Sequence, residues 1–208
     1  MKRLLPLLCL AALTASPAIS AIPIGFGVHG NYASLNVPEP LKPAYGAGFG
    51  GGAHVDFRFG VATVRVNGDY ISFGLDQDAY RDLLFNASGG EAAGIVKSAI
   101  GVDGGRISIL SFGANGKFNL PNKGVSPYAI VGLGSATLSM SDLSVTYQAA
   151  PVPGVSAAET VTKFMVNAGA GVDFPLGTVA LFVEVKYTWI FTEEEKSTYF
   201  PVTVGVTF

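Results

Sequence analysis

The ten residues Tyr199-Phe-Pro-Val-Thr-Val-Gly-Val-Thr-Phe208 alternate large apolar side chains with small or polar ones. A β-strand turns successive side chains to opposite faces, so this period of two predicts a strand with one apolar face and one mixed face. The apolar face comprises Phe200, Val202, Val204, Val206 and Phe208. One side of the strand therefore suits hydrocarbon, while the other accepts polar neighbours.

The same alternation recurs along the chain and predicts eight strands, at 24–35, 44–58, 61–73, 106–119, 125–138, 161–174, 178–191 and 199–208. Short connections (59–60, 120–124, 175–177) alternate with longer ones (36–43, 74–105, 139–160, 192–198). In a membrane, a closed sheet satisfies every backbone hydrogen bond and leaves no edge in lipid. We therefore expect an all-β fold: an eight-stranded antiparallel up-and-down transmembrane barrel with short periplasmic turns and four longer extracellular loops.

The first twenty residues have the pattern of a cleaved export signal. Lys2 and Arg3 precede an apolar stretch, Leu4–Leu13, that is too short to span a bilayer. Small residues at Ala18 and Ser20 suit a signal peptidase, so we expect a signal peptide at 1–20 and a single barrel domain at 21–208. Cleavage after Ala18 remains an alternative.

Composition agrees with an exported membrane barrel. Charged residues make up 13% of the chain, against a usual quarter, and no apolar run outside the signal reaches the length of a transmembrane helix. Acidic residues outnumber basic ones, 15 to 13, and the excess grows when Lys2 and Arg3 are removed, which argues against a nucleic-acid partner. Cys9 leaves with the signal, so we expect no disulfide and no thiolate metal site.

Aromatic residues on the predicted lipid face fall into two bands. Such bands are typical of the two interfaces of a bilayer, and a soluble barrel has no reason to form them. The band near the short turns comprises Phe26, Phe57, Phe118, Tyr128, Phe174 and Phe208, and the band near the long loops comprises Tyr32, Tyr45, Tyr70, Phe164, Trp189 and Phe200. The strand at 125–138 is apolar on both faces, so its inner face stays undecided.

These features resemble one known family. The Gly-rich strand start Ala44-Tyr-Gly-Ala-Gly-Phe-Gly-Gly-Gly52, the strand Pro127-Tyr-Ala-Ile-Val-Gly-Leu-Gly134 and the terminal Phe208 are similar to the small outer-membrane barrels of the OmpA transmembrane domain, OmpX, OmpW and opacity-protein type. The resemblance implies a Gram-negative outer membrane and places this chain among lipid and lipopolysaccharide. It also implies that the apolar face of the terminal strand is the assembly signal read by the barrel-assembly machinery, namely Phe200, Val202, Val204, Val206 and Phe208.

Polar side chains concentrate on the predicted inner face, in the half of the barrel nearer the short turns. Because an eight-stranded lumen is filled by side chains and a lone buried ion is costly, opposite charges there should pair and plug the barrel. This predicted polar network comprises His54, Asp56, Arg58, Arg65, Asn67, Asp69, Asn115, Lys117, Asn167, Asp173, Glu184 and Lys186.

Toward the long loops the inner face becomes apolar. Two interpretations stay open: ordinary packing beneath the loops, which we favour, or an apolar vestibule for a small hydrophobic solute, as OmpW-like members imply. The residues concerned are Ile71, Phe73, Ile107, Ile109, Met165 and Ile190, which face the glycines 46, 48, 50 and 52.

Several apparent motifs are better explained by structural roles than by nucleotide or metal binding. Gly46-Ala-Gly-Phe-Gly-Gly51 matches G-x-G-x-x-G, but a strand follows it where a nucleotide site needs a helix. His29 and His54 could approach Asp56, yet hydrogen-bonded interior histidines are the simpler interpretation, so no metal is expected. Residues 76–87 could form one or two helical turns capped by Asp76.

The sequence therefore predicts a structural and surface-interaction barrel that displays its loops, without a catalytic site or cofactor. Binding or passage of small hydrophobic solutes is the second hypothesis. A lipid A-modifying enzyme is the third and least favoured, because such deacylases use a His-x-Ser pair, whereas His29 precedes Gly30-Asn31 and His54 precedes Val55-Asp56. An extracellular ligand could contact the loops.

Overall fold

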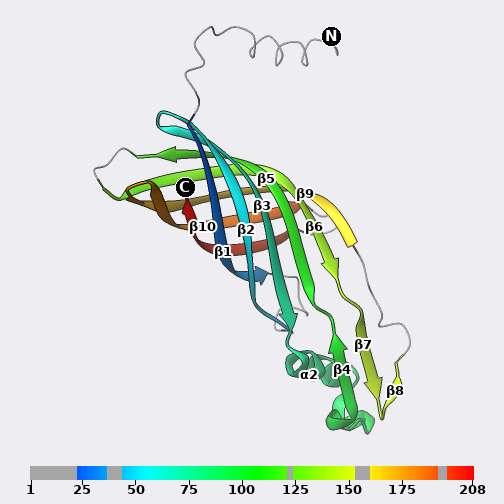
Figure 1. Ribbon diagram of the computed structural model, residues 1–208. Coiled ribbons are helices and arrows are strands. Elements are labelled where there is room, and N and C mark those ends of the chain that lie inside the picture. The colour runs from blue at the N-terminus through cyan, green and yellow to red at the C-terminus, as the bar shows by residue number, and fades with distance from the viewer. Residues whose placement is uncertain (1–22, 37–43, 121–123, 153–159, 192–195) are drawn as a thin grey trace, which may run out of the picture.

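The computed structural model describes residues 23–36, 44–120, 124–152, 160–191 and 196–208. Eight strands close into an antiparallel barrel in the order β1-β11-β10-β9-β6-β5-β3-β2 (Figure 1). They are β1 (Ile24–Asn36), β2 (Tyr45–Phe59), β3 (Ala62–Leu75), β5 (Ile107–Asn119), β6 (Ser126–Met140), β9 (Thr160–Leu176), β10 (Val179–Phe191) and β11 (Lys196–Thr207). The predicted eight-stranded barrel is thus confirmed, while the predicted export signal lies outside the described residues.

The terminal strand has the two faces that its alternation predicts. Phe200, Val204 and Phe208 are exposed outward, whereas Thr203 and Thr207 are buried inside the barrel. Neighbouring strands repeat this pattern, and the outer wall presents large apolar side chains around the barrel. Among the described residues, no helix has both the length and the apolar character needed to cross a membrane.

One connection is shorter than predicted. β11 begins at Lys196, which pairs with Phe191 of β10, so residues 192–195 alone separate the two strands. The segment 196–198 continues the β10–β11 ladder, since Ile190 pairs with Ser197 and Trp189 with Thr198. Its polar residues Lys-Ser-Thr gave no alternation from which a strand could be predicted.

Tyr45 was wrongly placed in the lipid-facing aromatic band. A bulge interrupts the β2–β3 ladder between Tyr45 and Gly48, where β2 carries one residue more than β3. The extra residue turns Tyr45 inward, where its hydroxyl donates a hydrogen bond of 2.9 Å to the Gly105 carbonyl. The same bulge leaves Gly46 exposed, so it does not belong to the inner face either.

Tyr128 was also wrongly placed among the lipid-facing aromatics. In β6, Tyr128 and Ile130 are buried in the barrel, whereas Val131 and Leu133 face outward. Room for the ring comes from Gly171, the residue paired with Tyr128 on β9, because a Cβ at position 171 would collide with the tyrosine ring. The undecided face of this strand is thereby settled.

Two long connections fold together beyond one end of the barrel, away from the C-terminal end of β11 (Figure 1). They contain α2 (Gln77–Ala87), the short helices η2 (Gly90–Ala93) and η3 (Lys97–Ala99), and a sheet of β4 (Ile100–Gly104), β7 (Leu143–Tyr147) and β8 (Ala150–Pro151) in the order β4-β7-β8. We call residues 74–105 and 139–152 the outer subdomain. Neither its sheet nor the two short helices were predicted.

The outer subdomain continues the barrel wall. Ile107 pairs with Met140 at the end of the β5–β6 ladder, and Gly104 pairs with Leu143 at the start of the β4–β7 ladder. Gly104 and Gly105 join the two ladders with φ of +83° and +72°, a conformation that favours glycine. The two ladders therefore form one long ribbon with a bend where they meet.

Helix α2 packs on both the barrel and the sheet. Asp76 caps it, accepting hydrogen bonds from the backbone of Asp78 and Ala79 at 3.1 and 3.0 Å, and the helix is longer than the one or two turns predicted. Its Tyr80 contacts two apolar cores, one at the barrel mouth and one on the β4–β7 sheet. The sheet core consists of Ile100, Val102, Leu143 and Val145.

Candidate functional site: the barrel interior and the outer subdomain

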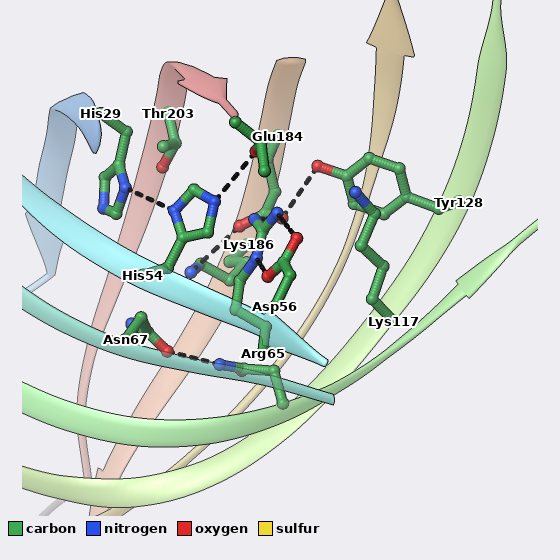
Figure 2. Close-up of polar contacts among 12 residues, drawn as sticks. His29, His54, Asp56, Arg65, Asn67, Lys117, Tyr128, Glu184, Lys186 and Thr203 are labelled. Carbon is green, nitrogen blue, oxygen red and sulfur yellow. Dashed lines mark hydrogen bonds and ion pairs between the residues drawn. The ribbon is translucent and has the colours of Figure 1, made fainter. Parts of the chain in front are cut away.

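Arg65 lies at the centre of the barrel interior. Its guanidinium donates two hydrogen bonds, of 2.7 and 2.9 Å, to the carboxylate of Asp56 on the neighbouring strand, and lies 3.4 Å from Glu184 across the barrel (Figure 2). All three side chains are at most 4% exposed. A two-pronged Arg–carboxylate pair is among the stronger charge-assisted contacts in proteins.

Glu184 has further partners. The Tyr128 hydroxyl donates a hydrogen bond of 2.9 Å to one carboxylate oxygen, and the Lys186 ammonium lies 3.1 Å from the other (Figure 2). Arg65 also lies over the ring of Phe182, 4.9 Å from its centroid. Charges from β2, β3 and β10 therefore form one connected cluster, to which β6 contributes the tyrosine hydroxyl.

A second pair lies closer to the short turns. The Lys117 ammonium is 2.7 Å from Asp173, whose carboxylate also accepts a hydrogen bond of 3.0 Å from Asn119. Lys117 lies 3.9 Å from the centroid of the Tyr128 ring, a cation–π contact. Arg58 is exposed in a pocket of about 300 Å³ at this mouth, so the charges here are less buried than at the centre.

Asp69 organises a third group, nearer the long loops. Its carboxylate lies 2.5 Å from His29 Nε2, accepts a hydrogen bond of 2.9 Å from Asn31, and accepts another from Asn67. Thr203 in turn donates a hydrogen bond of 2.7 Å to Asn31. Strands β1, β3 and β11 are thereby linked across the interior.

The two histidine side chains, His29 and His54, lie next to each other in the barrel interior. His29 Nδ1 lies 3.4 Å from His54 Nδ1, and His54 Nε2 lies 3.0 Å from the Thr207 hydroxyl. Glycines at positions 27, 52 and 205 clear the space for the two rings, because a Cβ at any of them would collide with an imidazole side chain. Within the described residues, no group of three His, Cys, Asp or Glu side chains is placed to hold a metal ion.

Two interior amides complete the polar region. Asn115 donates a hydrogen bond of 2.5 Å to Asn67, while the Oδ1 atoms of buried Asn115 and Asn167 have no hydrogen-bond partner in the described part of the chain. Asn167 lines a cavity of about 10 Å³, which is roughly enough for one water molecule. The interior at this level holds side chains and almost no free volume.

The apolar residues predicted near the long loops lie in one cluster. Ile71, Phe73, Ile109, Met165 and Ile190 are buried, and Ile107 packs against them. Tyr80 and Leu83 of α2 also pack on this cluster, together with barrel residues that include Ala33, Leu35, Ala136 and Tyr199. Two side chains of the helix thus pack against the apolar cluster at this end of the barrel.

The structure brings most of the predicted interior residues together and adds others. Residues that sequence reasoning did not assign to this network are His29, Asn31, Phe182, Tyr128, Thr203 and Thr207. Strand alternation alone places four of these side chains on the inner face and could have identified them: Asn31, Phe182, Thr203 and Thr207. Tyr128 required knowledge of the face of β6.

Comparison with known proteins identified one family and several solved structures with a similar fold. The family model for an outer membrane protein beta-barrel domain matches residues 5–208. Neisserial surface protein A, from Neisseria, superposes with a TM-score of 0.58 at 14% identity, covering 88% of this chain and 95% of that one. A major outer membrane protein from Thermus thermophilus superposes with a TM-score of 0.52 at 11% identity, covering 89% and 98%. No curated protein sequence matches the chain.

Proposed function

The chain belongs to the family of outer membrane β-barrel domains and lies in the outer membrane among lipids, and from that premise we propose that it is a non-catalytic barrel with a plugged lumen. In this proposal its role is structural, and its outer subdomain makes contacts at the cell surface. Lipopolysaccharide is its expected lipid neighbour in the outer leaflet.

The observation that best supports the plug is the buried cluster around Arg65. Its ions come from three strands, pair with one another and are almost fully shielded from solvent. An eight-stranded barrel has an interior just wide enough for side chains, and ions in such a space need partners because the loss of hydration is costly. A water-filled pore would leave these groups hydrated.

The apolar cluster supports the same proposal. It lies between the polar cluster and the outer subdomain, and Tyr80 and Leu83 of α2 pack against it. A solute would have to displace this packing and then the ion pairs. We therefore favour closure over the alternative role, the binding or passage of small hydrophobic solutes.

The surface-contact role is supported by the folded structure of the outer subdomain. Loops on a rigid scaffold commonly carry binding residues, and here two loops share an apolar core, a capped helix and a sheet. Such a unit presents a fixed surface, which reduces the entropy lost on binding.

Planar-bilayer recording of refolded residues 21–208 tests the plug. We expect no conductance steps. We also expect that a fluorescent apolar probe shows no binding that Met165→Trp, a substitution within the apolar cluster, can abolish. Conductance steps, or probe binding that this change abolishes, would establish the conduit instead. For the contact role, cells that express the chain should adhere differently to protein-coated surfaces from cells that lack it, and equal adhesion would contradict that role.

A further inference from the structure

The outer subdomain contains a small apolar pocket beside the C-terminal end of α2. It has a volume of about 190 Å³ and is lined chiefly by Leu84, Ile95, Ile100, Val145, Tyr147 and Val152. Sites for whole small molecules usually measure about 300–1,000 Å³. This pocket is therefore better matched to one apolar side chain of a larger partner than to a free solute.

The charge of the outer subdomain restricts the partner. Its acidic residues are Asp76, Asp78, Asp82, Glu91, Asp103 and Asp142, and its basic residues are Arg81 and Lys97. Both bases are already paired, Arg81 with Asp78 at 2.6 Å and Lys97 with Asp82. Arg106, which directly follows the subdomain, is exposed and reduces the excess by one, so the surface still carries more negative than positive charge.

Two charged residues of the outer subdomain, Glu91 and Lys97, lie along the chain between residues that line the pocket, and Lys97 is already paired with Asp82. Glu91 lies in η2, between Ser88 and Ile95, which both line the pocket, and it is exposed and forms no ion pair with the described residues. Like charges facing each other oppose association, whereas opposite charges steer it. Anionic partners, such as lipid phosphates or polyanions, are therefore disfavoured, and a cationic partner is favoured.

We propose that this pocket is the anchor site for a cationic segment of an extracellular protein. One apolar or aromatic side chain of the segment enters between α2 and β7, while neighbouring Lys or Arg side chains contact Glu91. A central anchor in a dry pocket supplies most of the affinity in such interfaces, and the charges supply rate and orientation. The inference rests on the proposed surface-contact function and names the chemistry of its partner.

Short peptides test the proposal on the full barrel in nanodiscs of zwitterionic lipid, which do not attract the peptides by charge. The probe is the peptide Lys-Lys-Trp-Lys-Lys-amide with a fluorophore on its N-terminus. The anisotropy of the fluorophore is followed, because Trp189 of the barrel would contribute to any tryptophan signal. The matched peptides carry the same fluorophore and have Ala in place of the central Trp, or Glu in place of every Lys. We expect saturable binding of the first peptide and binding at least about tenfold weaker for the other two.

Paired variants locate the binding. Ser88→Trp should fill the pocket from its exposed rim and weaken binding about tenfold or more, whereas Ser144→Trp, exposed on β7 outside the pocket, should not. Glu91→Lys should weaken binding more than Asp103→Lys, which changes the net charge equally but lies on the side of β4 opposite Ile100 and Val102. Unchanged heat-modifiable migration on gels checks that each variant folds.

The outcomes separate this proposal from the one on which it rests. Three outcomes would overturn the anchor site. The first is equal binding of all three peptides, and the second is an equal effect of the two variants within either pair. The third is tight binding of a neutral apolar dye whose affinity does not change with Glu91→Lys. If any of the three occurs while cells bearing the chain still adhere differently and the lumen stays silent, the proposed function stands without the anchor site. Conductance, or unchanged adhesion, would refute the proposed function whatever the peptides do.

Discussion

Asp56 and Arg65 are directly paired residues of β2 and β3, and their side chains form a two-pronged ion pair in the barrel interior, with hydrogen bonds of 2.7 and 2.9 Å. Glu184 lies farther from Arg65, at 3.4 Å, and has Lys186 and Tyr128 as additional partners. Asp56 therefore depends on Arg65 more than Glu184 does.

Arg65→Ala should lower the free energy of unfolding by about 3–5 kcal/mol, because it leaves a buried carboxylate without its cation. Urea unfolding in lipid vesicles measures the loss. The double variant Arg65→Ala with Asp56→Ala should recover part of it, and the double variant with Glu184→Ala should recover less. A water-filled lumen predicts a different result: an unchanged midpoint with altered conductance would exclude the plug.

Tyr128→Phe should lower the free energy of unfolding by about 1.5–3 kcal/mol, since the hydroxyl donates to a buried carboxylate and the change leaves the ring in place. Tyr187→Phe is the matched control, because Tyr187 is 39% exposed on the outer face of β10. The control should change stability by less than about 0.5 kcal/mol. Equal effects of the two changes would contradict the inward position of Tyr128.

The contrast between these two tyrosines shows what sequence periodicity could predict. In β11 and β10 one face is plainly more polar, so alternation places each side chain correctly. In β6 the residues of both faces are apolar or small, so alternation does not distinguish the faces. The inward position of Tyr128 depends on Gly171 of β9, and the sequence pattern of β6 alone cannot reveal which residue it pairs with. The bulge beside Tyr45 was missed for a related reason, since one extra residue reverses parity without changing composition.

The outer subdomain was missed because its strands are short and pair across a long separation. Residues 100–104 and 143–147 do alternate, but each covers only five positions and lies within a long connection. The helix was expected because Asp76 is a local cap signal and its partners are only two and three residues away. Interior polar residues followed from parity, whereas their pairing required the barrel register.

Gly48→Ala should destabilise the barrel by about 1–3 kcal/mol through overpacking. A Cβ at position 48 would lie 2.5 Å from the ring of Phe73, which is fully buried in the apolar cluster. Gly46→Ala is the control, because a Cβ there would meet nothing within 4 Å. A neutral Gly48→Ala in urea unfolding would contradict the close packing of Phe73 on Gly48, and a destabilising Gly46→Ala would contradict the bulge, which turns Gly46 outward.

An arginine on the outer wall should have a cost that depends on depth. Val131→Arg, on the apolar outer face of β6, should cost about 2–4 kcal/mol, while Thr162→Arg on β9 should cost only about 0–1 kcal/mol. Thr162 is exposed and shares a hydrogen bond of 2.9 Å with Thr137, and Thr160 donates one of 3.2 Å to Ser139. Hydroxyl groups therefore replace apolar side chains on the outer wall at the end of β6 and β9 toward the long loops. Equal costs in lipid vesicles would contradict this placement of the membrane boundary.

Phe208 joins the first and last strands of the barrel. Its backbone nitrogen donates a hydrogen bond of 2.7 Å to the Phe26 carbonyl and its carbonyl accepts one of 3.3 Å from Phe26, while its side chain is exposed on the outer wall. Phe208→Ala keeps both hydrogen bonds and removes the ring. If the ring is part of the assembly signal, this change should reduce the heat-modifiable barrel formed in cells several-fold.

The same variant separates assembly from stability. Refolded from urea into lipid vesicles without any assembly machinery, Phe208→Ala should reach nearly the wild-type yield, because an exposed aromatic ring contributes little to the packing of the barrel. Phe118→Ala is the control, since Phe118 is an exposed outward aromatic of β5, outside the terminal strand, and it should leave the amount of barrel in cells nearly unchanged. A wild-type amount of Phe208→Ala barrel in cells would show that the ring is not needed for assembly. An equal loss in cells and in vesicles would show that it acts through stability alone.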